Sequence, residues 1–384
     1  MKYKVLASSV LVICLTLAGF FALPLAEETG TKTLDNCYVG VAFCGNTTVE
    51  AQILIDKVKT YTNLFVVQSG PVSWNKTALD EICEYAVASG LKIIVYFGDL
   101  NPRVLDRNGL TWRTDWVKTA HDRWGESFLG LYYYDEWGGI WVDGNWTQKY
   151  IGAMPNPNYD NVATNFVQAI SRELSYVPKR DQFQLFVSDY MLYWYDYLGG
   201  YDVVFAQAGW NHSLSQDIAL VRGAATMQNK EWGIIITWKY KQAPYLDSGE
   251  AVYSQMTSAY RSGARYIVLF NYPSLEGNPY GVMQDEHFEA LKKFWKDTTL
   301  GILKWDSTKA EAVLVLPSNY GWGMRHPEDR IWGFWGPDSK SPDIWLLSRE
   351  LLTKYGNNLD IIYDNQNFNP TEKYVKTYFW NSNV

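Results

Sequence analysis

Eight short apolar runs are spaced along the chain, and segments with helical spacing of their apolar positions separate them. Several runs, such as Ile93–Phe97 and Ile234–Ile236, are continuously apolar, which is typical of strands covered on both faces. Strands that alternate with helices predict βα units and a parallel sheet. The expected strands are Cys37–Cys44, Leu64–Gln68, Lys92–Phe97, Phe128–Tyr134, Phe183–Val187, Asp202–Gln207, Gly233–Trp238 and Arg265–Asn271.

This order of elements predicts an α/β fold whose main part is a (β/α)8 TIM barrel, because eight consecutive βα units can close on themselves. Helix start signals follow three of the strands. Thr47–Glu50 and Ser213–Gln216 have capping-box spacing, and Thr77–Asp80 is its aspartate version. The connection Met191–Gly200 between the fifth and sixth strands is short and aromatic. If this connection does not contain a helix, the number of βα units is not eight, and a doubly wound open sheet is the alternative fold.

The length of 384 residues exceeds the roughly 250 that a barrel needs. We therefore expect three parts, which are a leader over residues 1–26, the barrel over 27–302, and a small α/β domain over 303–384. The last part is expected to be flavodoxin-like, and it has room for three strands at most, so it is small or incomplete. Its expected elements are a strand at Ala310–Pro317, a helix at Trp345–Tyr355 and a strand at Leu359–Tyr363.

The first residues have the layout of a secretory signal peptide. Lys2 and Lys4 precede an apolar run over residues 5–23, and Pro24 ends it. Because the run is close to the minimum length of a membrane span, an uncleaved N-terminal anchor is the alternative. We therefore expect a secreted protein or one held at the extracellular surface. Four N-glycosylation sequons favour the same location, and they begin at Asn46, Asn75, Asn145 and Asn211.

The charge and the cysteine content of the chain argue against some classes of binding partner and cofactor. The net charge is −7, and Lys and Arg form no block, which argues against a nucleic-acid partner. After the leader, Cys37, Cys44 and Cys83 permit one disulfide, for instance between Cys37 and Cys83, and one free thiol. The CxxC and Cys/His spacings of metal sites do not occur in the sequence, so neither a metal nor another cofactor is expected.

Aromatic residues are abundant, with 18 Trp and 28 Tyr, and many follow the ends of expected strands. Their rings offer flat apolar faces with one polar edge, which suits pyranose rings. Any single one could instead pack a loop onto the barrel rim. As a group they predict a carbohydrate-binding cleft, for which the candidate residues are Tyr96, Tyr134, Trp137, Gln207, Trp210, Trp238, Lys239 and Asn271.

Four carboxylates occupy expected strand ends, where barrel enzymes carry their chemistry. Asp135 and Glu136 end the fourth strand, Asp99 follows the third, and Asp189 follows the fifth. Glycoside hydrolysis usually needs one protonated and one ionised carboxyl group. We predict that Glu136 is the acid and that Asp189 is its partner. Asp99 and Asp135 are the alternative partners, although Asp135 cannot enter the cleft beside Glu136 if the strand stays regular. Capping of the next helix is the other role open to Asp99 and Asp189.

With this acidic pair and aromatic rim, the chain resembles the barrel glycoside hydrolases. A barrel followed by a flavodoxin-like domain is similar to the arrangement of family 42 β-galactosidases, and the resemblance implies a glycosidase. The chain departs from that family in two places. It has Asp135–Glu136 where those enzymes have Asn-Glu, and Thr237–Tyr240 where they carry a nucleophilic Glu. The resemblance therefore does not extend to a double-displacement mechanism.

Two functions fit this pattern, and carbohydrate is the partner in both. The first is an exported hydrolase that cleaves a polysaccharide or glycan, which the acidic end of the fourth strand favours because barrel enzymes often place catalytic groups there. The second is a barrel without catalysis that serves as an extracellular carbohydrate-binding or cell-envelope protein. The missing glutamate at the seventh strand favours the second.

Overall fold

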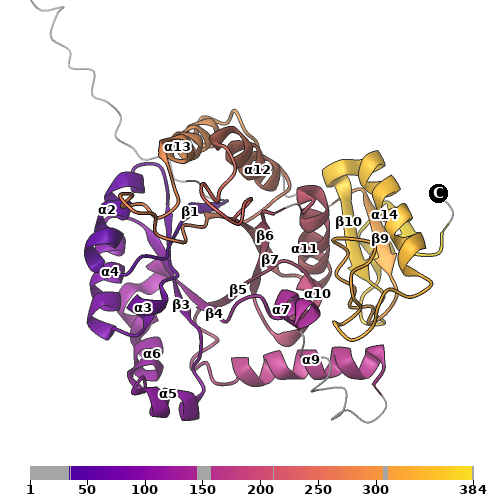
Figure 1. Ribbon diagram of the computed structural model, residues 1–384, viewed down its shortest axis with the longest axis horizontal. Coiled ribbons are helices and arrows are strands. Elements are labelled where there is room, and N and C mark those ends of the chain that lie inside the picture. Colours follow the sequence, from indigo (N-terminus) through magenta and orange to yellow (C-terminus); the bar gives the residue numbers. More distant parts are fainter. Residues whose placement is uncertain (1–33, 35, 145–156, 211, 306–309, 383–384) are drawn as a thin grey trace, which may run out of the picture. The chain divides into compact units, whose positions relative to one another are not determined.

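A computed structural model describes residues 34, 36–144, 157–210, 212–305 and 310–382. Eight parallel strands close into a barrel in chain order, which confirms the predicted (β/α)8 fold (Figure 1). All eight expected strands are present, and their ends differ from the prediction by two residues at most. They are β1 (Tyr38–Phe43), β2 (Leu64–Val67), β3 (Lys92–Phe97), β4 (Phe128–Tyr133), β5 (Gln184–Asp189), β6 (Val203–Ala208), β7 (Glu231–Ile236) and β8 (Tyr266–Leu269).

Helices surround the barrel (Figure 1). The predicted capping box at Thr47–Glu50 is present, since each residue's side chain accepts a hydrogen bond from the other's backbone N–H. The helix start predicted at Ser213 is confirmed, because Ser213 is the N-cap of α11, although its side chain makes no cap bond. The start signal at Thr77–Asp80 is misplaced by two residues, because Asn75 caps α4. The helices are α2 (Thr48–Val58), α3 (Gly70–Ser73), α4 (Lys76–Ala88), α5 (Pro102–Asn108), α6 (Trp112–Trp124), α7 (Trp137–Asp143), α9 (Tyr159–Leu174), α10 (Tyr193–Gly199), α11 (Leu214–Gln228), α12 (Gly249–Arg261) and α13 (Asp285–Thr299).

The short connection between β5 and β6 contains the helix α10, which lies between α9 and α11. It completes the fifth βα unit, so the open-sheet alternative is wrong. Almost the whole helix is buried, which explains its aromatic composition.

The barrel interior is filled by a separate cluster of side chains. Along β2, Leu64 and Val66 belong to this interior cluster, whereas Phe65 and Val67 pack in the cluster that includes the helices. This alternation is the period of two expected of a strand. Large rings close the interior, and those of Phe186 and Phe205 stack with centroids 5.7 Å apart. The core therefore leaves space for a ligand at the strand ends and not along the barrel axis.

The C-terminal residues form a three-stranded parallel sheet in the order β10-β9-β11. It comprises β9 (Ala312–Leu316), α14 (Ser341–Tyr355), β10 (Leu359–Tyr363) and β11 (Lys376–Phe379). A small α/β unit with three strands is thus confirmed, while its flavodoxin-like identity and its boundary at residue 303 stay predictions. The sheet packs closely on α11, where a Cβ on Gly223 would lie 2.7 Å from the carbonyl oxygen of Ile361.

Some predictions concern the surface and the thiols. Cys37, Cys44 and Cys83 are free, so the possible disulfide is not formed.

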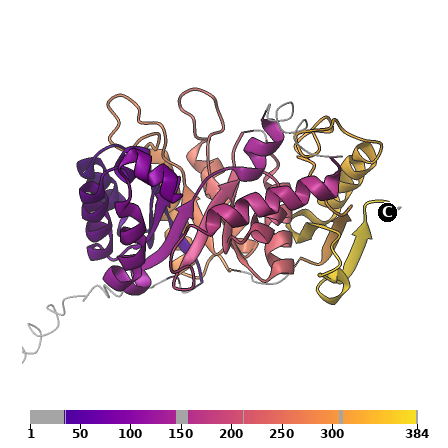
Figure 2. The same ribbon diagram turned by 90° about the horizontal axis from the view of Figure 1, so that it is seen from below.

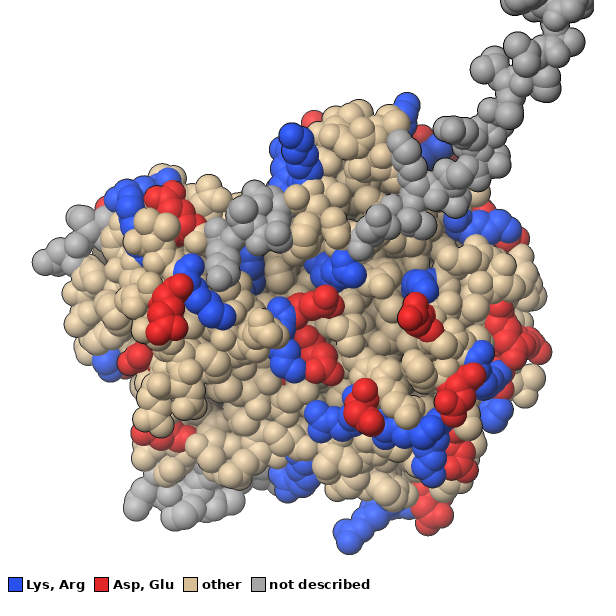
Figure 3. Space-filling view, turned by 180° about the vertical axis from the view of Figure 1, so that it is seen from behind, with Lys and Arg blue, Asp and Glu red and all other residues tan. Residues whose placement is uncertain are grey.

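Of the four sequon asparagines, Asn46 and Asn75 are exposed. The leader and the sequons at Asn145 and Asn211 lie outside the described residues. None of the helices in the described part combines the length and the apolar character needed to cross a membrane. Figure 3 shows basic and acidic side chains interspersed on the face behind that of Figure 1.

Candidate active site

The loop after β4 brings two carboxylates to the same place. Strand β4 ends at Tyr133, and Tyr134 and Glu136 both adopt left-handed backbone conformations, with φ of 63° and 54°. The strand is therefore not regular through Asp135 and Glu136, and both side chains line one cavity. The restriction expected of a regular strand, that Asp135 and Glu136 cannot both enter the cleft, therefore does not apply.

This first cavity has a volume of about 310 Å³ and lies at the carboxyl ends of the strands. Figure 2 shows two long loops, over residues 237–248 and 270–284, that project beyond this end of the barrel. Besides Asp135 and Glu136, three of the residues predicted for the site line this cavity, namely Gln207, Trp210 and Trp238. The lining residues are Gln68, Asp135, Glu136, Ser188, Gln207, Trp210, Ile235, Thr237, Trp238, Phe270 and Tyr272.

Hydrogen bonds connect the two carboxylates across three strands. Asp135 Oδ1 accepts from the hydroxyl groups of Tyr132 at 2.6 Å and Ser188 at 2.7 Å. The side-chain amide of Gln207 donates to Ser188 Oγ at 2.9 Å and to Glu136 Oε1 at 2.8 Å. Both carboxylates are thus held in place by side chains that are themselves buried.

Asp135 is the carboxyl group whose proton affinity is most clearly altered at the cavity. Burial, together with the nearby charge of Glu136, raises the pKa of Asp135 to about 7, against hydrogen bonds from Tyr132 and Ser188 that lower it. Asp135 is therefore partly protonated near neutral pH and can supply a proton there.

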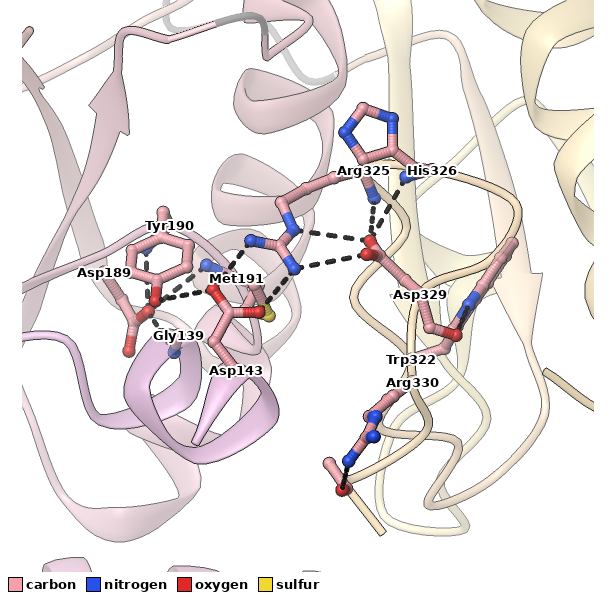
Figure 4. Close-up of polar contacts among 11 residues, drawn as sticks. Gly139, Asp143, Asp189, Tyr190, Met191, Trp322, Arg325, His326, Asp329 and Arg330 are labelled. Atoms are coloured by element: carbon pink, nitrogen blue, oxygen red, sulfur yellow. Dashed lines mark hydrogen bonds and ion pairs between the residues drawn. The ribbon is translucent and has the colours of Figure 1, made fainter. Parts of the chain in front are cut away.

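Asp189, the predicted partner of Glu136, lies outside the cavity that Asp135 and Glu136 line. It is fully buried, and its two oxygens accept from the backbone N–H groups of Gly138 at 2.5 Å, Gly139 at 2.8 Å, Tyr190 at 2.7 Å and Met191 at 3.2 Å. Figure 4 shows Asp189 beside Gly139, Tyr190 and Met191. Asp189 instead anchors the first turn of α7, where a Cβ on Gly139 would lie 2.0 Å from the Tyr190 ring.

Three predicted aromatic residues do not line the cavity. The Tyr134 hydroxyl donates to Glu173 at 3.2 Å, and Trp137 Nε1 donates to the Tyr201 hydroxyl at 2.8 Å, so the structure supports a packing role for these two residues. Tyr96 is half-buried and packs against the interior cluster of the barrel, with its ring centroid 5.5 Å from that of Tyr132. Burial raises the pKa of Tyr96 to about 12.

Three predicted polar residues also have local partners. Asp99 accepts from the backbone N–H of Asn101 at 2.6 Å, next to the start of α5. Asn271 Oδ1 accepts from the N–H of Val282 at 3.1 Å and so holds the loop after β8. The backbone N–H of Lys239 donates to a loop carbonyl at 2.7 Å. None of the three lines the first cavity.

An aromatic wall faces the carboxylates from the loops after β6, β7 and β8. The rings of Trp238 and Tyr272 are parallel within 14°, with centroids 6.0 Å apart, and Trp210 meets Trp238 at 65°. Trp238 Nε1 donates to the backbone carbonyl of Tyr272. Tyr272 is 49% exposed, so an apolar face is available to a ligand.

Sequence reasoning missed several lining residues, notably Gln68, Ser188 and Thr237. Gln68 Oε1 and Thr237 Oγ1 are buried and bond to no other group in the described part of the chain, so they are free to bind a ligand hydroxyl. Ser188 could have been found from the alternation along β5, because it shares the inward face with Phe186, and Asp189 does not.

A second cavity of about 550 Å³ adjoins the first. Glu136, Gln207 and Trp210 line both. The other lining residues come from the barrel loops and from the segment after β9, and they are Asp143, Tyr190, His212, Lys241, Arg325 and His326. Glu136 therefore stands at the border between an aromatic cavity and a polar one.

Comparisons with known proteins bear on the fold. The chain matches no family model and no curated protein. Among solved structures it is similar to a GH5_18 protein from Streptomyces cattleya in complex with GlcNAc, with 11% identity, a TM-score of 0.53, and coverage of 90% of this chain and 98% of that one.

Two further structures are more distant. A D-psicose 3-epimerase from Clostridium cellulolyticum H10 has 9% identity and a TM-score of 0.43, with coverage of 70% and 99% of the two chains. An α-L-fucosidase isoenzyme from Paenibacillus thiaminolyticus has 12% identity and a TM-score of 0.44, with coverage of 73% and 52%. At such identities a likeness shows the fold alone. The chain thus shares the barrel fold of glycoside hydrolases, and the likeness to family 42 stays a prediction.

Proposed function

We propose that this protein is a glycoside hydrolase in which Asp135 and Glu136 cleave a glycosidic bond of a polysaccharide or glycan. The observation that carries the proposal is that both carboxylates line one cavity and face an aromatic wall. Aromatic faces bind the CH-rich side of a pyranose ring, and two carboxyl groups supply the acid and the base or nucleophile of glycoside hydrolysis.

In this proposal Glu136 delivers the proton, because it lies at the border of the two cavities and so beside a bond that spans them. The pKa of Asp135, raised to about 7, leaves this neighbouring carboxyl group partly protonated near neutral pH. The Gln207 amide fixes the Glu136 carboxyl through a 2.8 Å hydrogen bond. Gln68 and Thr237 offer polar atoms to the hydroxyl groups of the bound sugar.

One observation favours a second candidate, a carbohydrate-binding protein without catalysis. The wall of the first cavity that comes from β7, β8 and their loops consists of Ile235, Thr237, Trp238, Phe270 and Tyr272. None of these lining residues is a carboxylate. In the family 42 enzymes, the nucleophilic Glu stands at the end of the seventh strand, on this side of the cavity. A protein that only binds carbohydrate needs the aromatic wall but needs neither a catalytic acid nor a nucleophile.

The test is hydrolysis of a panel of polysaccharides and aryl glycosides by the wild type and by three variants. Glu136→Gln and Asp135→Asn keep the shape of each side chain and remove its charge or transferable proton. Each should lower hydrolysis by about 10²- to 10⁴-fold. Asp99→Asn is the matched control, because Asp99 also follows a strand but lies outside the cavity, and it should be nearly as active as the wild type. Binding of oligosaccharide without cleavage at any pH would favour the second candidate.

We also propose that the protein acts outside the cytoplasm, on the strength of the leader and sequons in the sequence. Deletion of residues 1–26 should leave a soluble protein with an unchanged circular dichroism spectrum. Full-length protein that stays in membranes, together with an insoluble deletion variant, would instead identify the leader as an anchor with a structural role.

A further inference from the structure

The second cavity is built by two parts of the chain that are distant in sequence. Glu136, Gln207 and Trp210 form its border with the first cavity, and His212 and Lys241 belong to loops of the barrel. Arg325 and His326 come from the segment between β9 and α14. The C-terminal part of the chain therefore supplies one wall of a cavity that reaches Glu136.

Ion pairs hold this wall in place. Arg325 makes two hydrogen bonds to the Asp143 carboxylate, at 2.6 and 2.9 Å, and another to Asp329 at 3.2 Å (Figure 4). Tyr190 also donates to Asp143, at 3.0 Å. Asp143 is the last residue of α7, and Glu136 is the N-cap of the same helix. Arg325 thus binds the C-terminal end of α7, and Glu136 precedes the first residue of the same helix. The two turns of α7 therefore set the distance between Arg325 and Glu136.

The lining of the second cavity suits a neutral, hydroxyl-rich group. Asp143 and Asp329 pair with Arg325 and compensate its charge, and the lining offers hydrogen-bonding groups from Tyr190, His212, Lys241 and His326. Burial, which the charge of Arg325 reinforces, lowers the pKa of His212 to about 4. The ring is thus neutral at neutral pH, and its buried Nδ1 has no hydrogen-bond partner in the described part of the chain.

We infer that the second cavity binds a neutral sugar unit on the leaving-group side of the bond that is cleaved, and that the C-terminal segment sets this specificity. The inference rests on the proposed function and adds the substrate class, which is a chain cut between two sugar units. The bond between the anomeric carbon and the glycosidic oxygen breaks. The departing sugar in the second cavity takes the proton of the acid, and water supplies a hydroxyl to the anomeric carbon and a proton to the base.

The test compares two substrates that share the sugar in the first cavity, namely an oligosaccharide and a 4-nitrophenyl glycoside. His326→Ala and Lys241→Ala each remove a polar group that is exposed to the second cavity and outside the Arg325 ion pairs. Each variant should lower the ratio of kcat/KM for oligosaccharide to that for the aryl glycoside by about 3- to 10-fold, as the loss of one hydrogen bond does. Arg330→Ala is the control, because Arg330 is exposed on the same segment and does not line the cavity, and it should leave the ratio unchanged.

The outcomes separate the two claims. If the wild type cleaves both substrates and neither variant changes the ratio, the inference about the second cavity is wrong and the proposed function stands. The same holds if Arg330→Ala changes the ratio as much as His326→Ala does. If the wild type cleaves neither substrate at any pH, the proposed function is wrong and the inference fails with it.

Discussion

At the scale of single residues, Asp135 combines a raised pKa with a place at the cavity, and this has a consequence for stability. Its pKa is about 7 in the folded protein, against an ordinary value of 3.8. Between these values the folded state holds a proton that the unfolded state has released. The free energy of unfolding contributed by this group therefore falls as the pH rises from about 4 to about 7.

Asp135→Asn removes the charge and keeps an oxygen that can accept from Tyr132 and Ser188. We expect the variant to be more stable than the wild type at pH 8, by about 1 to 3 kcal/mol, and nearly equal to it below pH 4. Urea denaturation at the two pH values measures both differences. Equal stabilities at pH 8, or a larger gain at low pH than at high pH, would contradict the raised pKa.

Trp210 lines both cavities and belongs to the aromatic wall. Trp210→Ala should weaken oligosaccharide binding by about 1 to 3 kcal/mol, because a stacked apolar face is lost. Calorimetry in the Glu136→Gln background measures binding without turnover. Trp74→Ala serves as a control, since Trp74 is 56% exposed and outside the cavity, and it should bind like the parent. A similar loss in both variants would argue against a defined aromatic site.

At the scale of elements, the first turn of α7 positions the proposed acid and depends on Asp189. Asp189→Ala leaves four buried or half-buried backbone N–H groups without their acceptor. We expect it to lower the free energy of unfolding by about 2 to 5 kcal/mol, whereas Asp99→Ala, which loses one such bond at a turn, should cost about 1 kcal/mol or less. If Asp189→Ala keeps its denaturation midpoint and loses activity, Asp189 is the catalytic partner that the sequence predicted.

The sequence predicts the strands well and the end of β4 poorly, for a physical reason. Strands buried on both faces are continuously apolar, so their number and order can be read from the pattern. The left-handed conformations of Tyr134 and Glu136 are unfavourable for these residue types and persist because contacts from β5 hold the turn. Such contacts between distant segments leave no local pattern. For this reason the sequence could indicate Asp135 and Glu136 as candidates, but it could not show that both side chains line one cavity.

At the scale of the whole molecule, a buried ion pair joins α11 of the barrel to the C-terminal sheet. Arg222 Nε donates to Asp360 Oδ1 at 2.8 Å, and both side chains are buried. The second Asp360 oxygen accepts from the Tyr374 hydroxyl at 2.8 Å. The sheet from which the segment with Arg325 extends is therefore anchored to the barrel, as a wall of the second cavity requires.

Arg222→Ala should lower the free energy of unfolding by about 3 to 5 kcal/mol, because it leaves the Asp360 carboxylate buried without its cation. The double variant Arg222→Met with Asp360→Leu should recover most of this loss. Thermal denaturation followed by circular dichroism compares them. A single variant as stable as the wild type would show that the sheet is not anchored by this pair.

The sequence could indicate a C-terminal α/β unit but not its contribution to the cavity. The apolar runs of β9 and β10 are visible in the pattern, whereas Arg325 and His326 lie in a long loop without periodicity. The position of this loop depends on the contact between Arg325 and Asp143, which are 182 residues apart along the chain.

The central claim, that Glu136 protonates a glycosidic leaving group, is tested most directly by the leaving-group dependence of hydrolysis. A series of aryl glycosides with leaving groups of increasing acidity is hydrolysed by the wild type and by Glu136→Gln, and log(kcat/KM) is plotted against the leaving-group pKa. Good leaving groups need little acid assistance. We therefore predict a shallow slope for the wild type and a steep one for Glu136→Gln, with the variant losing least on the most activated substrate. Equal slopes for the two proteins would contradict the assignment of Glu136 as the acid.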